Sequence, residues 1–504
     1  MVLITMGMVS SCMNKVEMNY FWSENTERVL VDLGEYRTKY EPLIVHYQTD
    51  SLKREAATFL LDHIGVHFSV NMYWQDSLGR LVEFNELNYP DFDSSIDAFD
   101  QLKQKHGQLR PVLYNYYDVD TVSVDFLIKS IDQAFGVWRQ PWAKDLSFED
   151  FCDYILPYRS MTEPVQDWFV AYSDRYGWLT DSLSHQGYDY EACMLISDAI
   201  KNDFMNQWGL GIRQEIPLKG PLNANHQNRG ECADRVNFST YSLRSQGVPA
   251  VVDMVPYWAT TAGRHYWNAT LDHTGKQNYF QGGMDYPGGY VITRELPKVY
   301  RYTYREQPNS IASRVKDSIP DPILRSKNLK DMTAKYIQTV NLTVQLDKVH
   351  ASQPIYLTVF NGMKWRPVCG EFADDNGTVV FPDMGYGIVY TPARVKDDKF
   401  VSIHAPIAVD HSGSITVLNP DLGAKRAFVM LQQEEYLMYR PGSEYKLYYW
   451  DKGWRLIDTQ IYKRGERLNF SEVYKNALYL MIPEYSWGKE RPFTMDAEGN
   501  RVWW

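Results

Sequence analysis

The chain has 504 residues and a formal net charge of −11. Because this length is too great for one hydrophobic core, several domains are expected. Hydrophobic residues make up 44% of the chain and charged residues 23%, a balance typical of globular and not of disordered proteins. The negative charge and the lack of a long Lys/Arg run argue against a nucleic-acid partner, since phosphate binding needs clustered cations. The 15 Trp and 37 Tyr residues could form sugar-stacking surfaces, but packing inside β-sandwiches is the favoured interpretation.

The N-terminal segment, residues 1–14, is short and apolar and contains Val9-Ser10-Ser11-Cys12. Small residues ahead of a cysteine resemble a bacterial lipobox, in which the cysteine is lipidated. We therefore expect a lipid anchor on Cys12 that holds the chain at the bacterial cell envelope, at the outer membrane or on the periplasmic side. An ordinary N-terminal segment with a stray cysteine is the alternative. No later run reaches the ~18 apolar residues of a membrane helix, so the anchor would be the membrane contact.

The other four cysteines are Cys152, Cys193, Cys232 and Cys369. Their spacing fits no CxxC metal pattern, and no calcium loop of the EF-hand type is visible, so neither a metal nor another cofactor is expected. Cys152 and Cys193 lie on apolar faces of predicted helices and are expected in the core. If Cys12 is lipidated and Cys232 is a nucleophile, three cysteines remain, and three cannot all pair within one chain. A disulfide framework is therefore not expected.

Helical periodicity dominates residues 15–145. Apolar residues recur at helical spacing between Glu24 and Ile64, and again in an i, i+3, i+4, i+7 stripe between Val122 and Trp138. Ser147 begins a pattern typical of a capping box ahead of a further helix, and residues 190–205 are amphipathic. The sequence thus predicts a helical N-terminal region over 15–145 and a mostly helical chain as far as about residue 220.

Beyond about residue 308 the pattern changes to short alternating runs separated by turn signals such as Asn376-Gly377, which is typical of antiparallel strands. Five residues of this region recur after the same interval of 89 positions. The pairs are Tyr356/Tyr445, Trp365/Trp454, Arg366/Arg455, Phe381/Phe470 and Tyr390/Tyr479. This repeat predicts two related β-sandwich modules, over 330–425 and 430–504. The shared aromatic residues are interpreted as core, with a glycan-binding platform as the alternative.

A cysteine lies at the start of a predicted helix in the stretch Gly230-Glu231-Cys232-Ala233-Asp234. The residues after it follow one helical face as far as Leu243, and Gly247 is expected to end the helix. Unpaired N–H groups and the helix dipole favour an anion at a helix start, so the pKa of the Cys232 thiol is expected to be lowered. A thiolate is nucleophilic, which makes Cys232 a candidate nucleophile; a buried structural thiol is the alternative.

A histidine follows on a predicted strand. Residues 250–255 form a β-branched run, and the next strand alternates from His265 through Trp267 to Leu271. Turn residues at 272–275 predict a hairpin whose second strand runs from Gln277 to Gln281. A turn centred near His273 would place Gln281 or Gly282 opposite His265, where an orienting group could hold the imidazole. A satisfied core histidine is the alternative for His265.

The order of cysteine, helix, Arg-x-x-Gly-Val-Pro, strand, His-x-Trp and hairpin strand resembles the transglutaminase-like superfamily, whose fold is related to papain. The resemblance covers residues 230–283 and implies a transglutaminase core over 146–306, with Cys232 as nucleophile and His265 as base. The family usually has an aspartate where this chain has Gln281, and the nearest acid is Asp285, the alternative third member. Residues 146–159 resemble the helical lead-in of large bacterial transglutaminase-like lipoproteins. The expected fold is thus α+β and multidomain.

The function predicted from these features is a cell-envelope thiol hydrolase. It would cleave an amide bond, on peptides or glycopeptides, through an acyl-enzyme on Cys232. An amine in place of water would make the reaction a transglutamination. The alternative is a catalytically weak or inactive binding protein of the same fold that recognises glycans or protein partners. Gln281 in place of an acid motivates this alternative, and a thiol pKa at or above that of free cysteine would favour it.

Overall fold

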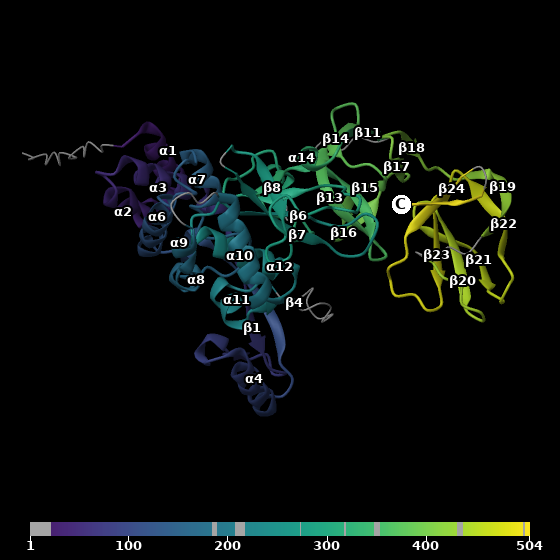
Figure 1. The fold of residues 1–504 in the computed structure, drawn as a ribbon. Coiled ribbons are helices and arrows are strands. Elements are labelled where there is room, and N and C mark those ends of the chain that lie inside the picture. The colour runs from purple at the N-terminus through teal and green to yellow at the C-terminus, as the bar shows by residue number, and fades with distance from the viewer. Residues whose placement is uncertain are drawn as a thin grey trace, which may run out of the picture.

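The computed structural model describes residues 22–183, 189–206, 217–272, 274–316, 319–346, 353–430, 437–496 and 499–504. Over these residues the chain is an α+β protein of several domains, with helices concentrated toward the N-terminus and antiparallel strands toward the C-terminus (Figure 1). The segment 1–14 with Cys12 lies outside the described residues. None of the helices in the described part of the chain combines the length and apolar character that a membrane crossing requires.

The N-terminal helices pack around one large apolar cluster. They are α1 Glu24–Asp32, α2 Arg37–His46, α3 Ser51–His63, α5 Asp118–Thr121, α6 Val124–Trp138, α7 Phe148–Tyr154, α8 Phe169–Tyr176 and α9 Trp178–Ser182, with 3-10 turns η1 Gly34–Tyr36 and η2 Ile64–Val66. The predicted stripe on α6 is buried in this cluster at Leu127, Ile131 and Phe135. The Ser147 hydroxyl accepts a hydrogen bond from the Asp150 N–H and caps α7, as its spacing predicts.

A three-stranded sheet lies inside the stretch 15–145, for which the sequence predicts helices. It comprises β1 Phe68–Gln75, β2 Leu81–Val82 and β3 Arg110–Tyr117 in the order β2-β1-β3, with η3 Glu86–Asn88 and α4 Phe92–His106 between β2 and β3. Helix α4 covers one face, where the Trp74 and Phe99 rings lie 4.6 Å apart. Exposed tyrosines interrupt the apolar alternation of both long strands, which explains why the sequence does not predict them.

The central region places helix α12, Cys232–Arg244, against an antiparallel sheet of order β10-β9-β6-β7-β8. Its strands are β6 Val251–Val255, β7 His265–Leu271, β8 Gln277–Phe280, β9 Tyr300–Tyr302 and β10 Leu329–Asp331, and the neighbouring elements are α10 Asp189–Asp203, β4 Met205–Asn206, α11 Pro221–Gln227, β5 Arg229–Gly230, α13 Ile311–Arg314 and α14 Thr333–Tyr336. The buried Asn268 side chain of β7 donates to the Val236 carbonyl at 3.1 Å and ties the strand to the helix. Strand β10 lies beyond residue 306, so the sheet extends past the expected core boundary.

Helix α12 ends as its sequence predicts. Gly247 has a left-handed φ of +77°, and the N–H groups of Val248 and Gly247 donate to the carbonyls of Leu243 and Arg244 in the pattern of a Schellman motif. A side chain at Gly247 would also come within 2.4 Å of the Val137 carbonyl oxygen of α6. The turn therefore fixes the helix against the N-terminal helices.

The C-terminal region consists of two modules with the same strand order. The first contains β11 Val340–Gln345, β12 Pro354–Asn361, β13 Lys364–Phe372, β14 Thr378–Met384, β15 Ile388–Lys396, β16 Lys399–Ser402, β17 Ile407–Val409 and β18 Ile415–Val417; the second contains β19 Asp421–Met430, β20 Glu444–Trp450, β21 Trp454–Ile461, β22 Leu468–Lys475, β23 Tyr479–Pro483, β24 Pro492–Met495 and β25 Arg501–Trp503. The pair β11-β14 faces the sheet β13-β12-β15-β17-β18, and β19-β22 faces β21-β20-β23-β24-β25. Because β19 pairs with β22, the second set of strands begins at Asp421, before the expected 430.

The repeat of 89 positions is confirmed by this topology. Tyr390 donates to the Gly385 carbonyl at 2.9 Å, and Tyr479 donates to the Tyr474 carbonyl at the same place in the second module. Such a tyrosine corner is a recurrent feature of β-sandwiches. The repeated Tyr and Phe residues are all buried; five of the six lie in the two module cores, whereas Tyr356 packs in the cluster of the central sheet. The two tryptophans of the repeat, Trp365 and Trp454, instead pack between the modules. The ring centroids of Trp365 and Trp450 lie 5.3 Å apart.

Candidate functional site

Helix α12 begins at Cys232, and a capping box holds its first turn. The Glu231 side chain accepts from the Asp234 N–H, while the Asp234 carboxylate accepts from the Glu231 N–H at 3.1 Å. A side chain on Gly230 would come within 2.5 Å of the Asp234 side chain, so this position needs glycine. The sequence Gly-Glu-Cys-Ala-Asp therefore places Cys232 at the first helical position, where its own N–H has no acceptor within the helix.

The expected lowering of the Cys232 pKa is wrong. Burial raises the pKa of the thiol, and the nearby carboxylate charge of Glu231 raises it further. The backbone N–H groups of Tyr266 and Ala233 hydrogen-bond to the sulfur and offset only part of this rise. Desolvation disfavours the charged form of a thiol and here outweighs the helix start. Burial of Cys232 therefore favours the protonated thiol over the thiolate.

His265 opens strand β7, and the hairpin register differs from the prediction. Strand β7 pairs Asn268 with Phe280 and Leu271 with Gln277, and strand β8 ends at Phe280. Gln281 therefore lies just beyond the ladder and is not a cross-strand neighbour of His265. It still reaches the imidazole, because its Oε1 lies 3.2 Å from Nε2 of His265. His273 lies outside the described residues.

A hydrogen-bonded relay connects His265 to Asp285 through Gln281. The Gln281 Nε2 donates to the Asp285 carboxylate at 3.1 Å. A carboxylate can only accept, so the amide must turn its NH₂ toward Asp285 and its oxygen toward His265. The oxygen in turn requires a proton on Nε2, which leaves Nδ1 as the basic nitrogen of the neutral imidazole. The structure thus brings both candidates for the third member into one chain of contacts.

The turn that carries Gln281 is fastened to the helix and the sheet. The Gly282 N–H donates to the Asn268 side chain at 3.2 Å, and a side chain on Gly282 would lie within 2.0 Å of the Ser239 hydroxyl of α12. Gly283 has a left-handed φ of +71° and lies against Ile200 of α10. The Gly-Gly pair after Gln281 therefore permits the close approach that holds the amide beside His265.

Three aromatic side chains surround the imidazole, and of these the sequence singles out Trp267. Ring centroids of Trp258, Trp267 and Tyr290 lie 6.1, 6.1 and 6.0 Å from that of His265. Burial lowers the pKa of His265; the Gln281 hydrogen bond raises it in part, and the positive charge of Arg294 lowers it further. Trp258 and Tyr290 come from loops, where periodicity carries no signal; the Pro-Gly-Gly turn ahead of Tyr290 is the nearest hint.

Cys232 lies near Tyr266, the residue after His265, and near Tyr290, whose ring neighbours the imidazole. The sulfur accepts from the Tyr266 N–H, one residue after His265. Burial raises the pKa of Tyr290 to about 12, and the negative charge of Asp285 contributes to the rise. No hydrogen bond joins the sulfur and the imidazole among the described residues. The raised thiol pKa and the lowered imidazole pKa together favour a neutral resting pair over a thiolate–imidazolium pair.

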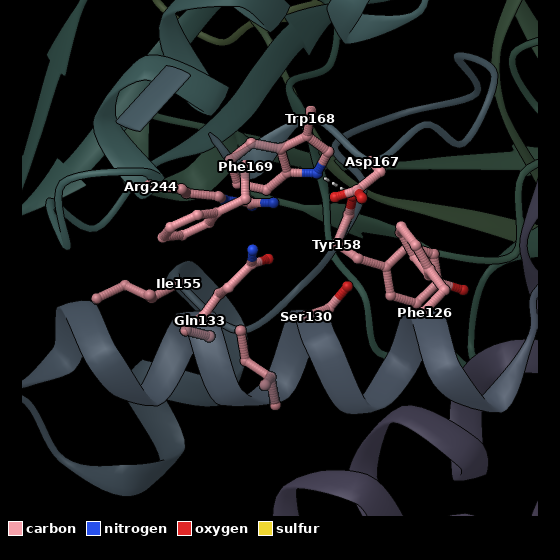
Figure 2. A pocket seen from close by; sticks show the side chains of 11 residues that line it. Phe126, Ser130, Gln133, Ile155, Tyr158, Asp167, Trp168, Phe169 and Arg244 are labelled. Atoms are coloured by element: carbon pink, nitrogen blue, oxygen red, sulfur yellow. Dashed lines mark hydrogen bonds between the residues drawn. The ribbon is translucent and has the colours of Figure 1, made fainter. Parts of the chain in front are cut away.

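A separate pocket lies at the opposite end of α12, beside α6 (Figure 2). It is lined by Phe126, Ser130, Gln133, Ala134, Ile155, Leu156, Tyr158, Asp167, Trp168, Phe169 and Arg244. Arg244 is about 20 Å from Cys232 along the 13-residue helix. Its Nε donates to the Ala250 carbonyl, and its Nη1 donates to the carbonyls of Pro157 and Arg159. This pocket is therefore separate from the Cys232 site.

The remaining cysteines and possible metal ligands add nothing to the site. Cys152 and Cys193 are buried in the core, as expected. In the part of the chain that the structure describes, no three His, Cys, Asp or Glu side chains gather so as to hold a metal ion.

No protein-family model matches the chain, and no curated protein matches it. Two solved structures show distant similarity. A proposed cysteine protease from Cytophaga hutchinsonii has 14% identity and a TM-score of 0.19, and the match covers 23% of this chain and 39% of that chain. Red sea bream transglutaminase has 8% identity and a TM-score of 0.20 over 87% of this chain and 78% of that chain. At these scores the similarities carry no argument, and the proposal below rests on the residues.

Proposed function

We propose that the protein is a thiol hydrolase of transglutaminase-like type that cleaves an amide bond through an acyl-enzyme on Cys232. The observation that supports this proposal is the relay behind His265. It leaves Nδ1 of the imidazole as a base, while the sulfur of Cys232 lies against the next residue of the same strand. Nucleophile, base and orienting group are the three parts that cysteine hydrolases share.

The reaction would proceed from a neutral pair. The Cys232 sulfur forms a bond to the amide carbonyl carbon while His265 takes the thiol proton. The Cys232 N–H, free at the helix start, donates to the oxygen of the tetrahedral intermediate. The C–N bond then breaks as the imidazolium returns the proton to the leaving amine. Water then attacks the thioester carbonyl carbon and gives a proton to His265; the C–S bond breaks, and the imidazolium returns the proton to the sulfur, which releases a carboxylic acid and the free thiol.

Peptides and glycopeptides of the bacterial cell envelope are the substrates we propose, with Cys12 as the lipid anchor. Water is the favoured acyl acceptor because it is abundant there; an amine acceptor would make the product a new amide. Glycan contact through the C-terminal modules belongs to the same proposal. The two tryptophans of the repeat lie between the modules, so such contact would use other side chains.

A peptide bearing a thiol-directed acyl electrophile tests the nucleophile. We expect one adduct per chain, mapped to Cys232 by mass spectrometry, and its loss in Cys232→Ala with an unchanged melting temperature. His265→Ala should keep the thiol but slow labelling about 100-fold, because the base is missing. Cys152→Ser serves as the matched thiol control and should label like the parent if it remains folded. Equal labelling of Cys232→Ala and the parent would remove the nucleophile.

The raised pKa of Cys232 favours a second candidate function, a binding protein of the same fold with weak or no activity. In such a protein the relay would be a structural remnant. The full chain on a glycan array, together with the acyl probe, separates the two candidates. Glycan retention without labelling of Cys232 supports the binding protein, whereas labelling that depends on His265 supports the hydrolase.

A further inference from the structure

Four carboxylates near the Cys232–His265 pair accept hydrogen bonds within the chain. Glu231 and Asp234 cap α12, Asp285 accepts from Gln281, and Asp321 accepts from the Tyr257 hydroxyl and from two backbone N–H groups. These four carboxylates accept hydrogen bonds from groups of the chain itself. They are therefore not the groups that meet a ligand at the site, although the net charge of the chain is −11.

Arg294 presents the opposite charge at the same place. Its side chain is exposed, and none of the ion pairs between described residues includes it. The guanidinium carbon lies 5.8 Å from the centroid of the Trp258 ring, and that ring lies 6.1 Å from His265 with 25° between the planes. The Trp258 ring therefore lies beside both Arg294 and His265, next to the reacting groups.

The charge of Arg294 acts on the site itself, since it lowers the pKa of both His265 and Tyr290. Arg264, the residue just before β7, donates to the Tyr266 hydroxyl. Arg294 forms no ion pair with another described residue and is available to a ligand. An arginine supported by an aromatic ring offers a planar pair of N–H donors that matches a carboxylate.

We propose that Arg294 binds a carboxylate of an acidic peptide substrate, next to the amide that Cys232 attacks. This inference rests on the proposed hydrolase function and adds the substrate class to it. An acidic peptide would be repelled by the net charge of the chain at long range, so a cation at the site is what makes its binding favourable. The guanidinium would also fix the register of the peptide relative to the sulfur.

Two acyl probes that differ only in Glu or Gln beside the electrophile test this assignment. The rate of Cys232 labelling is measured for both probes in the parent, Arg294→Gln, Arg294→Lys and Arg464→Gln. Arg464 is an exposed arginine of the second module and gives the same change in net charge away from the site. We expect the parent to prefer the Glu probe about tenfold, since a charge-assisted pair contributes on that scale.

Arg294→Gln should reduce this preference to about one, and Arg294→Lys should keep part of it because the charge remains without the planar fork. Arg464→Gln should retain the preference of the parent. Equal labelling by the two probes, or a preference that survives Arg294→Gln, would overturn the assignment while leaving Cys232 as a nucleophile. Labelling that does not depend on Cys232 would instead refute the hydrolase function on which the inference rests.

Discussion

Strand β7 sends two side chains, two residues apart, into hydrogen-bond relays that each end on an aspartate. One runs from His265 through Gln281 to Asp285, and the other runs from Trp267 through Tyr336 to Asp253. The second relay is the tighter: the Trp267 Nε1–H donates at 2.7 Å and the Tyr336 hydroxyl at 2.6 Å. The two relays share a strand and a layout, so their differences isolate what a functional relay requires.

The difference lies in how each carboxylate is neutralised. Asp253 is fully buried and receives two hydrogen bonds of 2.7 Å from Arg301, which cancel its charge. Asp285 is half-buried, and none of the ion pairs between described residues includes it. The charge of Asp253, which Arg301 neutralises, can stabilise the fold. It cannot stabilise an imidazolium at His265, which lies two residues before Trp267 on the same strand. In the proposed mechanism, the aspartate without a counterion, Asp285, is therefore the one that can act on His265.

Breaking the relay from Trp267 to Asp253, whose charge Arg301 neutralises, should have the largest effect, and this effect is on stability. Asp253→Asn leaves the buried Arg301 without its counterion, and we expect a loss of about 3–5 kcal/mol in the free energy of unfolding. Chemical denaturation measures this loss. The double variant Asp253→Leu with Arg301→Met removes both charges and should recover much of the stability. A loss below about 1 kcal/mol in Asp253→Asn would show that the pair is not an anchor.

Removing Gln281, the middle residue of the relay from His265 to Asp285, should reduce the reactivity of Cys232. Gln281→Leu abolishes the acceptor for Nε2 of His265, so the imidazole loses its orientation and its preferred tautomer. We expect labelling of Cys232 by the acyl probe to slow about 100-fold, with stability within about 1 kcal/mol of the parent. Denaturation and labelling rates on the same sample separate the two effects. An unchanged rate would mean that another group orients His265.

Asp285→Asn should slow labelling about tenfold, because the replacement amide no longer forces Gln281 to present its oxygen. Burial already lowers the pKa of His265. In the parent, the fall of the labelling rate on the acid side of the pH profile, the acid limb, therefore lies below pH ~6.5. Removing a negative charge lowers the imidazole pKa further, and the limb should move to lower pH. A purely structural role would reduce the rate without moving the limb. Adding Gln281→Glu to Asp285→Asn supplies a carboxylate directly and should restore the rate.

Local patterns in the sequence sufficed for the elements that hold the site. The start of α12 and its end at Gly247 follow from one helical face and one glycine, because both depend on neighbours in sequence. The two modules follow from aromatic residues that recur at a fixed interval. The predicted site residues Cys232 and His265 each begin a regular element, so local patterns are enough to point to them.

The features that the sequence did not predict depend on contacts between distant segments. The dipole argument for Cys232 omits its burial, which reverses the direction of the pKa shift. The hairpin ladder stops at Phe280, and the position of Gln281 depends on how Gly282 packs against Ser239 of α12. Trp258 and Arg294 lie in different loops, so no periodicity relates them. Such sites require the tertiary structure.

The smallest effect is expected from Tyr336→Phe, the counterpart of Gln281→Leu in the neutralised relay. The Trp267 N–H loses its acceptor and Asp253 loses one donor, but Arg301 still holds the carboxylate, so the cost should be about 1 kcal/mol. Labelling of Cys232 should stay within about twofold of the parent, since the charge near His265 is unchanged. A strong loss of labelling with little loss of stability would show that the two relays act together, and the distinction between anchor and reactive carboxylate would fail.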